Sequence, residues 1–137
     1  MIVVDTNVWS ELAKLQPNEH VRRWEADRSD QLWMSAIVLA EFRAGAKLMP
    51  AGRSRGALEQ LIEALIAGYA DRILVFDEAC SRLYGEVLAS AKAAGKPIQA
   101  ADAMIAATAR AHDMSVATRD RNDFAGAQVR LIDPWQP

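Results

Sequence analysis

Short apolar runs alternate with longer amphipathic segments along this chain, and this alternation limits the folds that it can adopt. The first run, Ile2-Val3-Val4, is not interrupted by polar residues, as is typical of a strand that is buried on both faces. Four later runs are also predicted as strands, at residues 32–34, 73–76, 116–117 and 129–132. Strands separated by helices favour a parallel sheet that is covered on both sides. The sequence therefore predicts an α/β protein, a three-layer α/β/α sandwich around a central, mostly parallel sheet.

The segments between the strands carry apolar residues at helical spacing. Four helices are predicted at residues 9–15, 18–28, 54–69 and 102–112. Two more follow Ser35 and Asp77, whose side chains can accept hydrogen bonds from the free N–H groups of a first helical turn. The helix after Asp77 is expected to end at Gly95, before Pro97.

Size and composition exclude several classes of protein. A chain of 137 residues, 51% of them hydrophobic and 25% charged, is expected to form one domain over residues 1–137. No apolar run reaches the ~20 residues of a membrane span, and no export signal is visible, so the expected location is cytoplasmic and away from the membrane. Cys80 is the only cysteine, which excludes an internal disulfide and a multi-cysteine zinc site. The net charge of -2 exerts no general attraction on nucleic acid, so a polyanionic substrate would need local basic residues and a bound cation.

Four carboxylates stand beside predicted strands or inside apolar helical runs. Asp5 ends the first strand, Asp120 follows the strand at 116–117, Asp102 starts a helix, and Glu41 lies about two turns into the helix after Ser35. In open parallel sheets, ligands bind at the carboxyl ends of the strands, where loops and helix N-termini gather. We therefore expect these four acids to converge at one edge of the sheet.

Carboxylates gathered in this way repel one another. A pair of unit charges ~5 Å apart costs about 3 kcal/mol at an effective dielectric constant near 20, and only a proton or a cation relieves this repulsion. An all-oxygen ligand set suits Mg²⁺ or Mn²⁺ rather than zinc. Because these ions also bind phosphate oxygens and activate water, the expected activity is that of a metal-dependent nuclease, which hydrolyses phosphodiesters.

Each acid also has a purely structural interpretation. Asp5 and Asp102 could simply cap the helices that follow them. For Glu41 a structural role is harder to argue, because it interrupts the apolar run 36–42 and buried glutamates are rare unless they are paired.

The acids near the end of the chain lie between basic residues. Asp120 and Asp123 could be ordinary loop acids paired with Arg119 and Arg121, and for Asp123 this is the preferred interpretation.

Other polar and aromatic residues are assigned structural roles. Asp77 is expected to cap a helix, Asp71 and Asp133 to lie in surface turns, His112 to interact with a helix dipole and His20 to sit on an exposed helix. Cys80 is expected in the core. Packing is also the preferred role for the tryptophans, Trp9, Trp24, Trp33 and Trp135, although each could stack on a base.

Four motifs, in order and in register along essentially the whole chain, give it a resemblance to a known family. They are Val3-Val4-Asp5-Thr6-Asn7-Val8, Ser35-x5-Glu41-Phe42, Gln99-Ala100-Ala101-Asp102-Ala103-Met104-Ile105 and Ala117-Thr118-Arg119-Asp120-x2-Asp123-Phe124. The chain resembles PIN-domain ribonucleases, and among them the VapC-type toxins, including FitB-like members, of type II toxin–antitoxin systems.

The resemblance implies roles for the site residues. It makes Asp5, Glu41, Asp102 and Asp120 the catalytic acids, with Asp5 and Asp102 in most direct contact with a Mg²⁺ or Mn²⁺ ion and Asp120 completing the metal ligands. Glu41 would act through a water on the metal or orient the attacking water. Supporting positions match Thr6, Asn7 and Thr118, which would donate or accept hydrogen bonds, and Asp123, an acid outside the ligand set. Candidate contacts to RNA phosphates are Arg43, Arg119 and Arg121.

The resemblance also implies partners. Such proteins cleave single-stranded or loop RNA, usually form homodimers, and are inhibited by a cognate antitoxin whose C-terminal segment blocks the site. Promoter DNA is bound only indirectly, through the antitoxin.

Two other interpretations compete with this one. A haloacid dehalogenase-like phosphatase also opens with an aspartate after its first strand, but it needs a second aspartate at the position of Asn7. The more serious alternative is a catalytically silent PIN-like binding or regulatory protein that acts through a partner. The complete set of four acids argues against it.

Overall fold

The computed structural model describes residues 1–136 and contains one five-stranded sheet. Its strands are β1 (Ile2–Val4), β2 (Leu32–Ser35), β3 (Ile73–Leu74), β4 (Ser115–Ala117) and β5 (Leu131–Ile132). All four strand pairs are parallel, and the strand order is β3-β2-β1-β4-β5. The predicted parallel sheet is confirmed.

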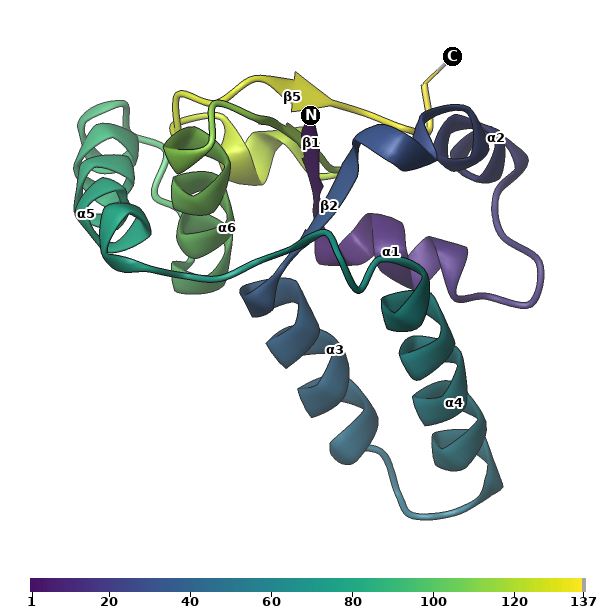
Figure 1. Cartoon of the computed structure of the whole chain (residues 1–137). Helices are drawn as coiled ribbons and strands as arrows, with labels where there is room; N and C mark the ends of the chain where they lie inside the picture. Colours follow the sequence, from purple (N-terminus) through teal and green to yellow (C-terminus); the bar gives the residue numbers. More distant parts are fainter. Residues whose placement is uncertain (137) are drawn as a thin grey trace.

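Helices cover both faces of this sheet, and two of them extend beyond the carboxyl ends of its strands. They are α1 (Thr6–Leu12), α2 (Glu19–Arg28), α3 (Ala36–Lys47), α4 (Arg53–Gly68), α5 (Glu78–Ala93) and α6 (Ala100–Ala111), with short 3-10 turns at Ser29–Gln31 and Arg121–Phe124. Figure 1 shows α5 and α6 on one side of the sheet and α1 and α2 on the other, while α3 and α4 form a hairpin that projects beyond the carboxyl ends of the strands. The three-layer arrangement is thus confirmed, with an added helical hairpin.

Local capping explains where the helices start. The Ser35 side chain accepts a hydrogen bond from the backbone N–H of Val38 at 3.1 Å, and Asp77 accepts one from Cys80 at 3.1 Å, so both predicted caps are confirmed. The prediction for the first helix was wrong by three residues at each end. Helix α1 starts at Thr6 because Asp5 caps it. The helix ends at Leu12, and Leu15 beyond it is 94% exposed.

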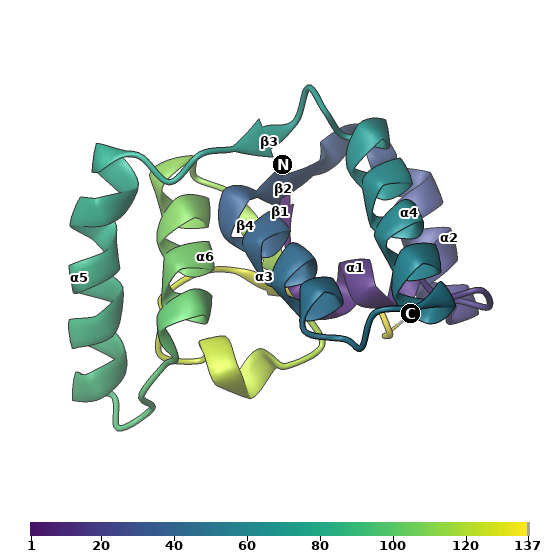
Figure 2. The same cartoon turned by 90° about the horizontal axis from the view of Figure 1, so that it is seen from below.

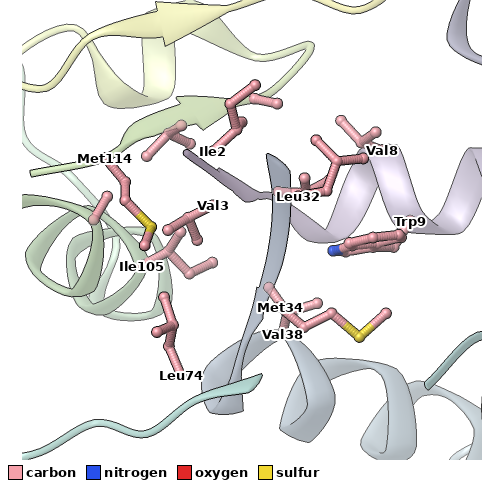
Figure 3. Close-up of a cluster of buried hydrophobic side chains, with 14 of the residues drawn as sticks. Ile2, Val3, Val8, Trp9, Leu32, Met34, Val38, Leu74, Ile105 and Met114 are labelled. Atoms are coloured by element: carbon pink, nitrogen blue, oxygen red, sulfur yellow. The ribbon is translucent and has the colours of Figure 1, made fainter. Parts of the chain in front are cut away.

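The apolar runs form the core between the layers. Figure 3 shows Val3 packed with Ile105 of α6 on one side of β1 and β2, and Val8 and Trp9 of α1 on the other. Val3, Trp9 and Ile105 are fully buried. The alanines of α6 are mostly buried, and their small side chains let this helix approach both the sheet and α5 closely. The core therefore fixes the two strand ends and the helix start that carry the predicted acids.

The strand register sets the geometry of the predicted site. Val4 pairs with Ala117, so the next residues, Asp5 and Thr118, leave adjacent strands side by side. The Asp5 backbone N–H continues this ladder by donating to the Ala117 carbonyl at 2.9 Å. From β1 the chain first builds the sheet toward β3 and then returns to the other side of β1 with β4. This point, where the strand order reverses, is where parallel sheets open a crevice for ligands.

Candidate active site at the carboxyl edge of the sheet

Asp5 is the most buried of the predicted acids, with 5% of its surface exposed. One carboxylate oxygen accepts a hydrogen bond from the Thr6 backbone N–H at 2.8 Å, and the other accepts one from the Thr118 hydroxyl at 2.8 Å. Burial raises the pKa of the Asp5 carboxyl and the nearby charges of Glu41 and Asp120 raise it further, whereas the two hydrogen bonds act in the opposite direction. Asp5 therefore caps α1, as its structural interpretation held, and it is also part of an acidic cluster.

Asn7 and Thr118 link Asp5 to Asp120. The Asn7 side-chain amide donates to the Asp120 carboxylate at 3.0 Å and to the Thr118 hydroxyl at 3.2 Å, and its oxygen accepts from the Arg119 backbone N–H. The Thr118 hydroxyl also accepts from the Asp120 backbone N–H at 3.1 Å. This network fixes the orientation of both carboxylates.

Glu41 is brought to the same place from α3. Its carboxylate accepts a hydrogen bond from the Thr6 hydroxyl at 2.5 Å, which ties α3 to the first turn of α1. The expectation that Glu41 is buried was wrong, because α3 projects beyond the sheet and leaves this side chain exposed. Figure 2 looks onto the carboxyl ends of the strands, where α3 lies between α6 and α1.

Asp102 comes from the third position of α6. Its capping interpretation was wrong, since Gln99 occupies the N-cap position. Within residues 1–136, no group donates a hydrogen bond to the Asp102 carboxylate, in contrast to Asp5. The pKa of Asp102 is raised to about 7, mainly by partial burial and additionally by the negative charges of the surrounding acids. In order of effect, these acids are Asp5, Asp123, Glu41 and Asp120.

The four predicted acids line one open cleft of about 420 Å³. A second hollow of about 400 Å³ shares Glu41 and Asp102 with it and is lined on its far side by Asp123. The structure thus brings all four acids to one surface and places Asp123 next to them. Asp123 and Asp120 are both exposed, and neither forms an ion pair with Arg119 or Arg121 in the part of the chain that the structure describes.

The acids of the cleft offer oxygen ligands of the kind that Mg²⁺ and Mn²⁺ prefer. Across residues 1–136, no three histidine, cysteine, aspartate or glutamate side chains are placed to hold one ion together. Mg²⁺, however, usually keeps several waters and takes only one or two protein carboxylates beside substrate phosphates. The Asp102 carboxylate, with its raised pKa and no hydrogen-bond donor, is a group that a cation would stabilise. The residues present therefore fit a hard divalent ion in their chemistry.

The arginines predicted to contact phosphate are separated by the fold. Arg119 lines the acidic cleft, with its guanidinium 5.1 Å from the ring centre of Trp135. Arg121 faces a different hollow, beside α2. Arg43 lies outside the cleft and forms an ion pair of 3.0 Å with Glu63 of α4.

Four cleft residues were missed in the sequence: Ser10, Glu11, Lys14 and Trp135. Ser10 lies four residues after Thr6 in α1, so a helix that starts at Thr6 would have placed these two side chains on the same face. Lys14 lies beyond the end of α1 at Leu12, where no helical spacing indicates its position. The buried Glu11 accepts hydrogen bonds from the Lys14 side chain and the Asn18 backbone N–H; burial opposes the ionised form, but these bonds outweigh it and lower the pKa of Glu11.

The remaining sequence assignments are largely confirmed. Cys80 and Trp9 are fully buried, and Asp133 accepts the backbone N–H of Trp135 in a turn at 2.9 Å. His20 and Asp71 are exposed. None of the helices in residues 1–136 combines the length and the apolar character that a membrane crossing requires.

Comparison with known proteins identifies the family. Residues 2–128 match the family described as PIN domain. The chain is 44% identical over 138 residues to a plasmid stability protein StbB of Pseudomonas syringae pv. tomato, covering 99% of each chain. It is 45% identical over 139 residues to a VapC ribonuclease of Sinorhizobium fredii, covering 100% of this chain and 99% of that protein. A solved structure of FitAB bound to a DNA fragment superposes with a TM-score of 0.92 at 42% identity, covering 100% of this chain and 97% of that one. The chain belongs to the PIN-domain family.

Proposed function

We propose that this protein is a metal-dependent endoribonuclease, the toxin of a toxin–antitoxin pair. One observation carries the nuclease proposal: Asp5, Glu41, Asp102 and Asp120, from four separate parts of the chain, line one cleft at the carboxyl edge of the sheet. The names of two relatives support the rest, the VapC ribonuclease described above and the toxin FitB of Neisseria gonorrhoeae, which is 42% identical over 137 residues.

The proposed ion is Mg²⁺ or Mn²⁺. Asp5 and Asp102 would be its direct ligands, and Asp120 would complete the set through a water that the ion keeps. When bound, such an ion would supply charge neutralisation at the phosphate and a water of lowered pKa. Asp5 is held in place by Thr6 and Thr118, so it would meet the ion without reorientation. Asp102 would lose its proton on binding, because its pKa of about 7 lies close to the working pH.

Glu41 would act on the attacking water, and the two basic side chains of the cleft would bind the RNA. We assign Glu41 the orientation of the attacking water, since the Thr6 hydroxyl fixes its carboxylate at the cleft wall. Arg119 and Lys14 line the same cleft and would contact the phosphates on either side of the cleaved bond. The substrate would be single-stranded or loop RNA, whose backbone can enter an open cleft.

The proposed partner is a cognate antitoxin protein. Structures similar to this chain include FitAB and VapBC bound to DNA, and we propose that this protein reaches promoter DNA in the same indirect way, through its antitoxin. The homodimer and the cytoplasmic location stay predictions.

Cleavage of total RNA by the purified protein tests this proposal. Wild type with Mg²⁺ or Mn²⁺ should give discrete products that EDTA abolishes. Asp102→Asn is the sharpest control variant, because the Asp102 carboxylate accepts no hydrogen bond within residues 1–136, so a loss of activity would not reflect a lost cap. We expect its cleavage rate to fall at least about 100-fold, as for removal of a group that stabilises charge in the transition state.

The alternative is a catalytically silent binding protein. Wild type and Asp102→Asn that are equally inactive with both metals would favour it and would overturn the nuclease proposal. Cleavage that persists in EDTA would overturn the metal dependence alone.

A further inference from the structure

The hollow beside α2, which Arg121 faces, differs in charge from the acidic cleft. It has a volume of about 530 Å³ and is formed by α2 and the chain after β5. Three arginines line it, Arg23, Arg28 and Arg121, together with the acids Asp27 and Asp133. The balance of these charges is positive, whereas the cleft carries five carboxylates against Lys14 and Arg119.

The cleft and the hollow share one wall. Trp135 lines the cleft, and its two neighbours in sequence, Pro134 and Gln136, line the hollow. Likewise, Arg119 lines the cleft and Arg121 the hollow. Two residues of extended chain span at most about 7 Å, so the two cavities lie next to each other across this short segment. Figure 1 shows the segment after β5 running across to α2.

One flat, partly exposed side chain, Trp135, stands on this path, and the guanidinium of Arg119 stacks over it. Trp24 is buried below the hollow, and the guanidinium of Arg28 lies 5.9 Å from the centre of its ring. In residues 1–136, neither Arg28 nor Arg121 forms an ion pair, and Arg23 has only an exposed contact of 3.5 Å with Glu19. Tryptophan and arginine planes alternating with free cations are the means by which proteins bind single strands without reading their sequence.

We propose that the hollow is a binding site for the single-stranded RNA that flanks the cleaved bond. The strand leaves the cleft over Trp135, which stacks on a base, and its following phosphates contact Arg121 and Arg23. This inference rests on the proposed function and extends it, because it assigns the affinity for RNA to a surface outside the acidic cleft. It predicts that long strands bind much better than short ones that fill the cleft alone.

Salt dependence of binding tests the inference. The probes are fluorescein-labelled oligouridylates of 12 and 3 nucleotides, measured by anisotropy in EDTA so that they stay intact. The double variant Arg23→Gln/Arg121→Gln should lower the slope of log K against log salt by about 1.4 for the 12-mer, at ~0.7 for each phosphate contact, and should leave the 3-mer unchanged. The matched control is Arg53→Gln/Arg130→Gln, which removes the same charge from residues that line neither cavity. Trp135→Ala should weaken 12-mer binding roughly tenfold.

Arg23 and Arg121 are exposed, and melting curves of the double variant should match those of wild type. Equal slopes for the double variant, its control and wild type would overturn the inference. If wild type cleaved total RNA with Mg²⁺ in the separate cleavage assay, the proposed function would stand without the inference. A reduced slope in a protein that cleaves no RNA would keep the binding site and overturn the nuclease. Unchanged RNA binding with lost binding of a co-expressed antitoxin would make the hollow a protein surface and would also overturn the inference.

Discussion

Thr118 has more influence on the acidic cleft than its size suggests. Its hydroxyl donates to Asp5 and accepts from both the Asp120 backbone and the Asn7 amide. Because Thr118 is fully buried and Asp5 is almost fully buried, water cannot easily replace the hydroxyl at the Asp5 carboxylate. The positions of Asp5 and Asp120 therefore depend on one side chain that carries no charge.

Thr118→Val tests this dependence. The substitution keeps the shape but leaves several buried or partly buried polar groups without their partner, so we expect a loss of about 1–3 kcal/mol in the free energy of unfolding together with a loss of cleavage. Thr108→Val is the matched control: Thr108 is equally buried, but its hydroxyl donates back to the Met104 carbonyl within α6 and otherwise contacts the weakly polar Cys80 thiol, with no carboxylate among its partners. That bond is redundant in a helix, so its loss should cost less than about 1 kcal/mol. Urea denaturation measures the free energy of unfolding of both variants. Equal losses of this free energy in the two variants would contradict the role given to Thr118.

The start of α1 shows what sequence reasoning can miss at the scale of an element. The apolar pattern begins at Val8 and Trp9, so the predicted helix began there, whereas the polar first turn is fixed by the Asp5 cap. That turn carries Thr6 and Asn7, which are the residues that hold Glu41 and Asp120. Polar helical turns have no apolar stripe to reveal them, so the apolar pattern alone placed the start of this helix at Trp9 instead of Thr6.

The loop after the turn at Arg121–Phe124 packs tightly on α5. A Cβ atom at Gly126 would lie 2.8 Å from the Cα of Ala91, and the Gly126 carbonyl accepts a hydrogen bond from Ser90. We expect Gly126→Ala to destabilise the protein by about 1–3 kcal/mol, because backbone must move to admit the methyl group. Gly85→Ala, inside α5 with no atom within 4 Å of the added Cβ, should instead stabilise it by up to about 1 kcal/mol. Thermal melts of both variants check this prediction. A change of Tm in the same direction for both would contradict the close approach of Gly126 to Ala91.

At the scale of the whole molecule, the strand order decides which acids meet. The sequence indicates a parallel sheet and places each acid at a strand end or a helix start, but it does not give the order of strands. The order β3-β2-β1-β4-β5 puts Asp5 and Thr118 on adjacent strands at the reversal point. In the same fold, Arg43 lies on the α3–α4 hairpin and Arg121 lines the hollow beside α2, so both are outside the acidic cleft. Such long-range placement follows from tertiary packing, which local patterns do not encode.

The gathered acids couple the stability of the whole protein to pH. Without metal, folded Asp102 keeps its proton up to a pH of about 7, while the unfolded chain releases it near 3.8. Between these values the folded state binds more protons, so this residue's contribution makes the free energy of unfolding fall as pH rises and level off above about 7. Asp102→Asn removes the effect. The full shift would correspond to ~4 kcal/mol, and partial exposure reduces it, so we expect the variant to be roughly 1–2 kcal/mol more stable than wild type at pH 8 and nearly equal to it at pH 4.

Denaturation in EDTA across this pH range measures the difference between the two proteins. Adding Mg²⁺ at pH 8 should then stabilise wild type more than Asp102→Asn, because the ion replaces the proton at the Asp102 carboxylate. The gap between the proteins should therefore narrow with metal and widen again when the metal is chelated. A variant that is less stable than wild type at pH 8 in EDTA would mean that Asp102 contributes to the fold, and that the repulsion inferred from its raised pKa is absent.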